Sequence, residues 1–456
     1  MQVSRRQWMG KIGLGGIAFG VGTALSARAD SDGDPAYSGF NSRIQKIPHS
    51  LTDVTSAYLE NGKVIQPARE LPVFHTADVV VVGGGAAGWG AAMGAARTGA
   101  KVALLERDGS LGGLWTNGGV LLVIGTGVRE NSQFKMVTKG VCAEFLERLE
   151  KLGSNAITAF DKSNYQPTVD PEAAKMMMDQ MLLAEKVDVF FHCWGVDVIQ
   201  SGNVVKGVVF ESKQGRQAIL AKTVVDCTGD GDVYFQAGED YQQITHGMGF
   251  VYRTGNADRV DKANLKAAKL NLGAGEPAKS ARWHNNIGPK ANGLDVKELS
   301  KIEMEHRKQA WDYVEKIRKV EGCSDVFMMH TCPLIGVRAT RLLDGVKQVS
   351  KKTAADSVKF DDVVAVSGHD GLRLPEFQIP YGALLPKKVD NLLAAGRCIS
   401  AASDIIDRVR LIPVCVVTGH AAGVASALAA KNNVTPREVP VAEIQKVLKA
   451  QGAYLG

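Results

Sequence analysis

The feature that most constrains this chain's fold is a β-branched run that leads directly into a glycine-rich turn. Residues 78–82 read Asp-Val-Val-Val-Val, which is typical of a buried parallel strand and too short for a helix. Gly83, Gly85 and Gly88 follow in the order G-x-G-x-x-G, and small residues continue to Ala96. This order predicts a strand, a tight turn and a helix, the opening unit of a mixed α/β fold.

Each glycine of this turn has its own role in a pyrophosphate-binding unit. The first allows the tight turn, the second lets the backbone approach the phosphates, and the third lets the helix pack against the strand. A second expected strand, residues 101–105, leads to Glu106, which can accept hydrogen bonds from ribose hydroxyls. The sequence therefore predicts a dinucleotide site, and this fingerprint does not choose between NAD and FAD.

Several further blocks resemble one known family. Residues 72–430 resemble the bacterial FAD-dependent oxidoreductase family related to the flavin part of heterodisulfide reductase. The blocks that carry the resemblance are a Gly-Gly turn at 111–116, an "ATG"-like motif at 225–232, an arginine block at 336–341, the segment 391–398, and then Val409, Arg410, Pro413 and residues 419–423. Ser403 stands where the family often has a histidine. Iron–sulfur cysteine spacing is absent, so we expect no such centre.

The resemblance implies FAD as the cofactor and a particular architecture. The fold it implies is α/β, a glutathione-reductase-type, Rossmann-like FAD-binding domain with an inserted α+β substrate or cap domain. The cofactor-binding residues that it implies are Gly83, Gly85, Ala87, Gly88, Glu106, Arg107, Gly113, Val196, Thr228, Gly229, Asp230, Gly396, Arg397, Gly419 and Ala421. Val196 is expected near the adenine, and Gly396 and Arg397 near the ribityl chain. A helix starting near Gly419 would point its N-terminus at the flavin pyrimidine ring.

Composition shifts and local patterns suggest the domain boundaries. We expect a signal segment at 1–29, a linker or arm at 30–73, the first part of the FAD domain at 74–240, a substrate or cap domain at 241–360, the return of the FAD domain at 361–430, and a C-terminal tail with a short helix at 431–456. Helices are expected at about 136–152, 171–186, 299–320 and 418–430.

The first residues have the pattern of an export signal. Arg5 and Arg6 precede a mildly apolar, glycine-rich run, and Ala27-Arg28-Ala29 reads as a cleavage site. The paired arginines resemble the twin-arginine type of bacterial signal, so we expect a periplasmic protein. Residues 1–29 carry four basic residues and no acid, and the remaining 50 basic and 48 acidic residues nearly balance. We expect no nucleic-acid partner and no membrane span once the signal is removed.

The seven cysteines show no metal-ligand spacing, and we expect no metal site. They are Cys142, Cys193, Cys227, Cys323, Cys332, Cys398 and Cys415. Cys193 and Cys227 lie in apolar runs and are expected in the core. Cys323 and Cys332 are the pair closest in sequence, and a bridge between them is an alternative to two free thiols.

Flavin chemistry requires the protein to orient a substrate and often to supply an acid or base. The catalytic candidates are Arg410, His420, His369 and Arg338. Arg410 could clamp a carboxylate or polarise a carbonyl, and His420 is expected at a helix start where the dipole lowers its pKa. For each candidate a purely structural role stays open, and Arg341, Asp407 and Cys398 are weaker candidates still.

The chain shows no second strand–G-x-G-x-x-G–helix unit, so we expect no nicotinamide substrate. We expect hydride transfer between a small organic substrate and flavin N5, with electrons passed to a periplasmic carrier, a quinone or a cytochrome. One alternative is a flavin-dependent reductase of an activated alkene, similar to the fumarate reductases. Another is a non-catalytic binding protein with a flavin fold. The oligomeric state stays open.

Overall fold

The computed structural model of the protein describes residues 57–131, 133–158, 166–369 and 374–456. The chain divides into two compact units, residues 1–69 and 70–456. In the first unit the described part holds a hairpin of β1 (Tyr58–Glu60) and β2 (Lys63–Ile65). The expected signal segment, residues 1–29, lies outside the described residues, so its assignment stays a prediction.

The second unit is built on a seven-stranded sheet whose central strands are parallel. Its strands are β3 (Val73–Val82), β4 (Val102–Leu105), β7 (Asp188–Phe190), β8 (Trp194–Ser201), β9 (Val204–Ser212), β10 (Gly215–Asp226) and β19 (Leu392–Ala394). The order β7-β4-β3-β10 is parallel, and β19 joins the C-terminal half of β10 in the same direction. The meander β8-β9-β10 is antiparallel. The expected mixed α/β fold is therefore confirmed.

The valines of β3 supply both faces of the sheet. Val79 and Val81 pack in the cluster that contains the helices α1 and α9, while Val80 and Val82 pack against β9 and α4 (Asp232–Gln236). Side chains alternate between the two faces of a strand, so a strand covered on both faces must be apolar throughout. The strand starts at Val73, five residues before the run that marks it in the sequence.

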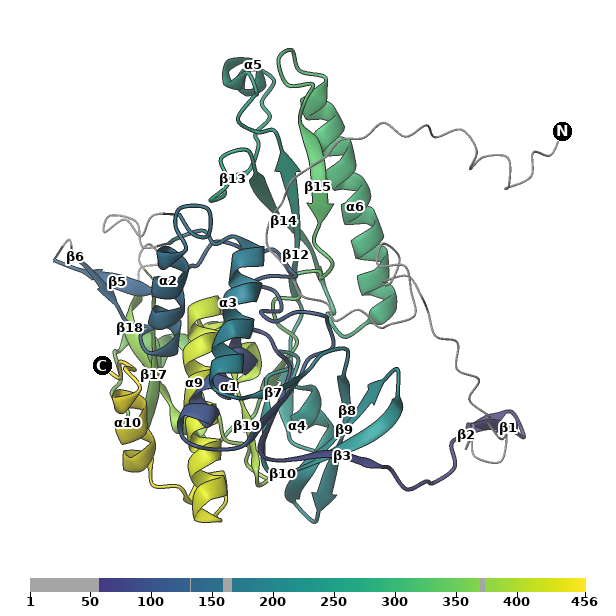
Figure 1. Ribbon diagram of the computed structural model, residues 1–456, viewed down its shortest axis with the longest axis vertical. Coiled ribbons are helices and arrows are strands. Elements are labelled where there is room, and N and C mark those ends of the chain that lie inside the picture. Colours follow the sequence, from purple (N-terminus) through teal and green to yellow (C-terminus); the bar gives the residue numbers. More distant parts are fainter. Residues whose placement is uncertain (1–56, 132, 159–165, 370–373) are drawn as a thin grey trace, which may run out of the picture. The chain divides into compact units, whose positions relative to one another are not determined.

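Helices α1 (Ala86–Arg97) and α9 (Ile412–Asn432) lie side by side against this sheet (Figure 1). Their contact is made through glycines on both helices. A Cβ added to Gly90 or Gly94 would lie 2.4–2.5 Å from a backbone oxygen of α9, and one added to Gly419 or Gly423 would lie 1.9–2.0 Å from a backbone oxygen of α1. The two backbones therefore touch directly, and no larger residue fits at these four positions.

A second sheet forms between β10 and β19 in the sequence. It contains β12 (His246–Gly255), β13 (Ala274–Gly275), β14 (Arg282–Ala291) and β15 (Phe327–Thr331), all antiparallel. The long helix α6 (Val296–Arg318) lies along it, as Figure 1 shows, and buries Ala310, Val314 and Ile317 in a core separate from that of the first sheet. The short helix α5 is Lys262–Ala267.

A buried ion pair lies between the second sheet and helix α3 (Pro171–Ala184). Arg253 of β12 donates from Nε to both carboxylate oxygens of Glu276, at 2.9 and 3.0 Å, and its Nη2 lies 3.8 Å from Asp170. The Glu276 side chain is fully buried. Asp170 also caps α3, accepting from the N–H groups of Glu172 and Ala173. The predicted start of that helix is confirmed.

The remaining elements complete the second unit. They are β5 (Gly127–Glu130), β6 (Gln133–Met136), α2 (Val141–Lys151), β11 (Tyr241–Gln243), β16 (Arg341–Leu343), α7 (Lys351–Ala355), β17 (Val363–His369), β18 (Leu374–Pro380), α8 (Ile406–Val409) and α10 (Val441–Ala450), with short 3₁₀ turns at Tyr381–Ala383, Gly396–Cys398 and Pro436–Glu438.

Two of the predicted segments differ from the structure. The sequence pattern predicts a helix from Met136, but Met136 ends the strand β6 and the helix begins at Val141. The pattern also predicts a C-terminal tail with a short helix at residues 431–456; the helix is present as α10, yet Ile444, Leu448 and Leu455 are buried in the main core. The apolar face of α10 covers α9 and β17, so this segment belongs to the folded body.

Within the described part of the chain, one helix is long and apolar enough to pass a membrane-span test. This helix is α9, and 94% of its most apolar 18-residue stretch is buried inside the protein. Its hydrophobicity is explained by its place in the core.

Gly423→Ala tests the contact between α1 and α9. We expect a loss of about 1–3 kcal/mol in the free energy of unfolding, because the new methyl group would overlap the Ala91 carbonyl oxygen, 2.0 Å away. Urea unfolding measures it. Gly275→Ala is the control, since a Cβ there meets nothing within 4 Å. Equal stability of the two variants would contradict the close backbone contact.

Candidate functional site

The carboxyl ends of four parallel strands bring the expected cofactor residues together. The strand β3 leads into the glycine turn, β4 into Glu106, β10 into residues 227–231, and β19 into residues 395–398. Backbone bonds continue the sheet across this edge, with Cys227 N to Val82 O and Ala395 N to Asp226 O, both at 2.9 Å. Ligands of open parallel sheets bind at this edge.

The glycine turn has the geometry that the sequence predicts. A Cβ on Gly83 (φ +98°) would lie 2.6 Å from the Cys227 carbonyl oxygen, and one on Gly88 would lie 1.7 Å from the Gly83 oxygen. At Gly85, by contrast, a Cβ would meet nothing within 4 Å. Gly83 and Gly88 are therefore required by the chain itself. Gly85 leaves open space at the N-terminus of α1, where an anion is favoured.

Glu106 is buried and binds the glycine turn. Its Oε2 accepts from Gly84 N at 2.6 Å and its Oε1 from Asp108 N at 2.8 Å. Burial raises the pKa of this carboxyl, while the two backbone bonds oppose the rise. Each oxygen of a carboxylate can accept a second hydrogen bond, so ribose hydroxyls can still donate to it.

The Gly-Gly turn lies against the first glycine turn. Gly112 N donates to Gly84 O at 2.8 Å, and a Cβ on Gly113 would lie 3.1 Å from the Gly85 Cα. Two glycine segments from separate parts of the chain thus border one open cradle, which we call the glycine cradle (residues 83–88 and 112–113).

The segment after β10 is organised by a buried carboxylate. Asp226 accepts from Thr228 Oγ1 at 2.7 Å and from the N–H groups of Val233 and Tyr234 at 3.0 Å, which fixes the start of α4. Burial raises the pKa of Asp226 to about 6, against these hydrogen bonds. The residues between Asp226 and α4 are held in place as a result.

Arg397 pairs with Asp230 beside the glycine cradle. Arg397 Nη1 lies 2.8 Å from Asp230 Oδ1, and Thr340 Oγ1 donates to the same oxygen at 2.6 Å. A Cβ on Gly229 (φ +79°) would lie 2.7 Å from Arg397 Nε. The structure thus brings together Gly229, Asp230 and Arg397, which the resemblance assigned to one site.

Gly396 adjoins the start of α1. A Cβ on Gly396 (φ +84°) would lie 2.8 Å from the Ala87 Cβ, and its N–H donates to Thr418 Oγ1 of α9 at 3.2 Å. The predicted sites at 83–88 and at 396–397 are therefore adjacent, although they are about 300 residues apart in sequence.

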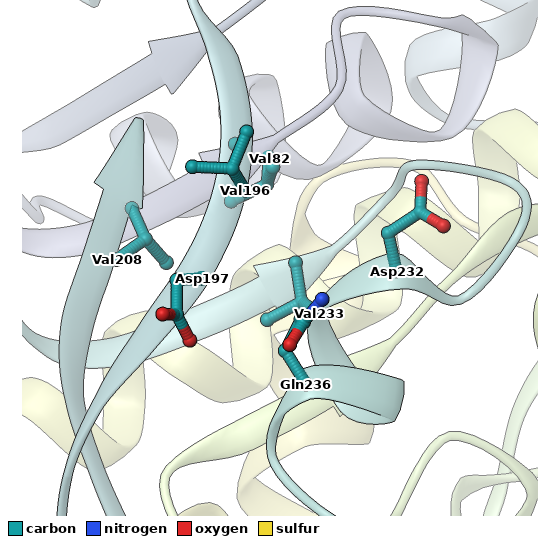
Figure 2. A pocket seen from close by; sticks show the side chains of 8 residues that line it. Val82, Val196, Asp197, Val208, Asp232, Val233 and Gln236 are labelled. Carbon is teal, nitrogen blue, oxygen red and sulfur yellow. The ribbon is translucent and has the colours of Figure 1, made fainter. Parts of the chain in front are cut away.

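Val196 lines a small hollow between the meander and α4 (Figure 2). The hollow is lined by Val82, Gly195, Val196, Asp197, Val208, Asp232, Val233 and Gln236. Nearby, the Arg107 guanidinium lies 5.6 Å from the centre of the exposed Trp194 ring. The roles of Val196 and Arg107 at an adenine stay predictions.

The expected helix start at Gly419 is wrong. The helix α9 begins at Ile412, seven residues earlier, with Pro413 in its first turn. Gly419 lies inside the helix and packs on the Ala87 backbone, and Ala421 is buried in the core. The helix end that could face a flavin ring is therefore at residues 411–414, where no side chain caps it.

His420 lies in the middle of α9 rather than at a helix start. It is 1% exposed, and its Nε2 lies 2.7 Å from Gln451 Oε1 beyond α10. The pKa of His420 is lowered to about 4 by burial, against the bond to Gln451. The expected direction of the shift is confirmed, but its cause is burial. His420 therefore packs in the core of the protein, and the catalytic role suggested for it stays an untested expectation.

Arg410 and Arg338 lie close together at the N-terminal end of α9. Arg410 donates to Asp407 Oδ1 from Nε at 2.9 Å and from Nη2 at 2.5 Å. The pKa of Arg338 is lowered by burial and by the charge of Arg410, while Asp407 opposes this. His246 of β12 lies 3.2 Å from the same Asp407 oxygen. No sequence pattern selected His246, because it is far from the family's blocks.

The structure also places the remaining catalytic candidates, Arg341, Cys398 and His369. Arg341 pairs with Asp232 at 2.8 Å and lies over the Phe235 ring, so it has a structural role. Cys398 is fully buried, as expected for a core residue. His369 ends β17, and its side chain lies outside the described part of the chain.

All seven cysteines are buried free thiols. Cys323 and Cys332 are not bridged, and they pack in different apolar clusters. Among the described residues, no group of three or more His, Cys, Asp or Glu side chains could hold a metal ion.

Comparison with known proteins identifies relatives of this chain. The family model described as FAD dependent oxidoreductase matches residues 78–247 and 251–448. A dihydrolipoyl dehydrogenase from Manduca sexta is 41% identical over 73 residues, which are 16% of this chain and 15% of that protein. The match thus covers a small part of the relative's length.

Solved structures with similarity to this chain are more distant. A geranylgeranyl bacteriochlorophyll reductase-like protein from Thermoplasma acidophilum is 15% identical with a TM-score of 0.42, covering 82% of this chain and 83% of that one. A p-nitrophenol 4-monooxygenase from Pseudomonas putida is 12% identical with a TM-score of 0.43, covering 83% and 84%. Similarities this weak say nothing about the reaction.

Gly85→Ala tests the glycine cradle. We expect a folded protein whose affinity for FAD falls about 5- to 100-fold, because the methyl group enters space that only the ligand fills. Bound flavin absorption per protein, with urea unfolding in parallel, measures both effects. In Gly88→Ala the new group overlaps the Gly83 oxygen, so stability falls as well. Full flavin content in Gly85→Ala would contradict the assignment.

His420→Gln tests the buried histidine. Unfolded histidine takes up a proton below about pH 6.5 and the folded form only near pH 4. Wild-type stability should therefore fall by up to about 3 kcal/mol as the pH drops across this window. Glutamine can still donate to Gln451, so the variant should show a flatter dependence. Urea unfolding at several pH values measures the slope, and His192→Asn on the surface should retain the wild-type slope.

Proposed function

This chain belongs to the FAD-dependent oxidoreductase family, and we propose that it is an exported dehydrogenase of a small organic molecule. FAD is its cofactor. In the proposed reaction the substrate loses a hydride and a proton, a two-electron oxidation, and the electrons pass on to a carrier. When bound, FAD supplies the flavin N5 as the hydride acceptor.

The observation that carries the proposal is the open glycine cradle at the carboxyl edge of the sheet. A Cβ added to Gly85 would meet nothing within 4 Å, although the neighbouring Gly83 and Gly88 are tightly enclosed. Glu106, Asp230 and Arg397 border the same edge and supply two carboxylates that accept hydrogen bonds and one guanidinium that donates them. These residues fit a dinucleotide whose pyrophosphate lies at the start of α1.

The start of α9 supports a flavin in this arrangement. Its N-terminus is uncapped by any side chain, and Cys415 in its second turn lies 3.8 Å from the position of a Cβ on Gly396. A positive helix end near a flavin pyrimidine ring favours the negative charge of the reduced cofactor. We therefore move the expected flavin contact from Gly419 to residues 411–414.

The finer architecture that we propose is a glutathione-reductase-type FAD domain with an inserted substrate or cap domain. The parallel order β7-β4-β3-β10-β19 with its antiparallel meander supports the first part. The sheet β13-β14-β12-β15 with α6 supports the second, because it has its own apolar core and lies between two strands of the first sheet in sequence.

We also propose a periplasmic location and a carrier other than nicotinamide. The paired Arg5 and Arg6 support export. A twin-arginine route carries folded proteins, which suits a chain that binds its cofactor first. The electron acceptor would be a periplasmic carrier, a quinone or a cytochrome.

A second candidate is the reduction of an activated alkene. It is favoured by Arg338, Arg410 and His246, since two arginines and a histidine suit an alkene that carries a carboxylate. The two candidates differ in the direction of electron flow.

Anaerobic spectroscopy of the exported protein tests the proposal. The protein is purified from the periplasmic fraction, its visible spectrum is recorded, and the cofactor released on denaturation is identified by mass. A panel of small alcohols, hydroxy acids and amines is then added. We expect FAD, and loss of flavin absorption with at least one donor.

The other outcomes separate the alternatives. If no donor bleaches the flavin but activated alkenes reoxidise the dithionite-reduced protein, the reductase is correct. A colourless protein that takes up no added FAD would favour the non-catalytic binding protein. Recovery from the cytoplasm alone would overturn the export proposal.

A further inference from the structure

Three basic side chains from separate segments meet beside the start of α9. Arg410 directly follows α8, Arg338 lies between β15 and β16, and His246 begins β12. Asp407 lies among them, bonded to Arg410 and 3.2 Å from His246 Nε2. We call these four residues the basic cluster.

The positive charge of the basic cluster is not balanced. Among the described residues, Arg338 has no hydrogen bond or ion pair, and its charged neighbours are Arg410 and Asp407. Asp407 already pairs with Arg410. Burial raises the pKa of its carboxyl, but Arg410 and His246 act in the opposite direction, and the net effect is a lowered pKa. The Asp407 carboxylate therefore has the guanidinium groups of Arg338, Arg408 and Arg410 as neighbours, so positive charge is in excess here.

Arg338 is held in this position by the backbone. The segment before it pairs with β12 through Gly336 N to Gly249 O at 2.7 Å and Gly249 N to Gly336 O at 2.9 Å. Its guanidinium lies 3.5–3.7 Å from the positions of Cβ atoms on Gly247 and Gly249, so it lies beside the first residues of β12. The backbone pairing of Gly336 with Gly249 thus places a partly buried arginine beside His246.

The basic cluster adjoins the residues that border the cofactor site. Burial raises the pKa of the Cys415 thiol, and the charges of Arg397 and Arg410 both oppose this rise. The Cys415 Sγ donates to the Arg410 carbonyl oxygen at 3.4 Å. From the other side, Thr340, two residues after Arg338, donates to Asp230, the partner of Arg397. A ligand at the cluster would therefore lie next to a flavin held by these residues.

We propose that Arg338, Arg410 and His246 form a subsite for a carboxylate group, so that the substrate is a small organic carboxylate. The inference rests on the proposed function, since it names the substrate class of the same site. A carboxylate supplies the missing negative charge, and its two oxygens match the planar fork of a guanidinium.

The exposure of these side chains fits this assignment. The Arg410 and His246 side chains are 24% and 21% exposed, so a solute can reach them. Asp407, at 50% exposed, serves as the counter-ion of Arg410 when no substrate is present. Ion pairs at this exposure are weak, and an incoming carboxylate can share or replace Asp407 on Arg410.

Ligand titration of the FAD-loaded protein tests the subsite. Acetate, succinate and benzoate are compared with their neutral amides, following the flavin spectrum and the heat of binding. At least one carboxylate should bind with saturation, and its amide about 10- to 100-fold more weakly. Arg338→Gln and Arg410→Gln should each weaken carboxylate binding by a similar factor while FAD content stays unchanged.

A second readout does not depend on the choice of ligand. Arg338→Gln removes an uncompensated charge, so its thermal midpoint should equal or exceed that of the wild type. A lower midpoint would make Arg338 a structural residue and overturn the proposal. Arg318→Gln, on the exposed face of α6 where Arg318 pairs with Glu315, is the matched control and should bind carboxylates normally.

The remaining outcomes are distinct from failure of the proposed function. If the wild type holds FAD but treats carboxylates and amides alike, or binds only inorganic phosphate, the subsite is wrong. If the wild type holds no FAD, or no donor bleaches it, the proposed function is at fault instead, and direct carboxylate binding measured by heat still decides the subsite.

Discussion

The direct backbone contact between α1 and α9 determines where both ends of the cofactor site lie. Gly90 and Gly94 on one helix and Gly419 and Gly423 on the other allow an approach that any side chain would block. Because α1 begins at the glycine turn, its position places the phosphate end of the site. The same contact fixes α9, whose N-terminus stands near the expected flavin ring. Close packing of two helices thus sets the distance between two halves of a ligand.

The sheet beneath these helices brings residues that are far apart in the sequence close together in space. Strands β3, β4, β10 and β19 run parallel, so the residues that follow them gather at one edge. Each following segment is then fixed by its own bonds: Glu106 binds the glycine turn, and Asp226 holds the start of α4. The site needs little flexibility, because buried hydrogen bonds and close-packed glycines position its backbone before any ligand arrives.

The arginines around this edge differ in whether a nearby carboxylate balances their charge. Arg341 has Asp232 and the face of Phe235, and Arg397 has Asp230. Arg338 has no such partner among the described residues, and Arg410 shares one exposed acid. Satisfied arginines stabilise the fold, whereas an uncompensated arginine in a partly buried position is a cost that a bound anion removes. This contrast separates structural from ligand-binding roles among residues of one type.

The sequence by itself determined the strand, the glycine turn and Glu106, because these depend on local patterns: β-branched runs, glycine spacing and the length of one βαβ unit. The cofactor and the segments around Asp230 and Arg397 came from the resemblance. Tertiary structure alone decided that α9 starts at Ile412 and that His420 is a core residue, since a uniformly apolar helix carries no periodic signal for its boundary or its faces. It alone also joined His246 to Arg338 and Arg410, because charge balance depends on which distant segments pack together, and no local pattern records that.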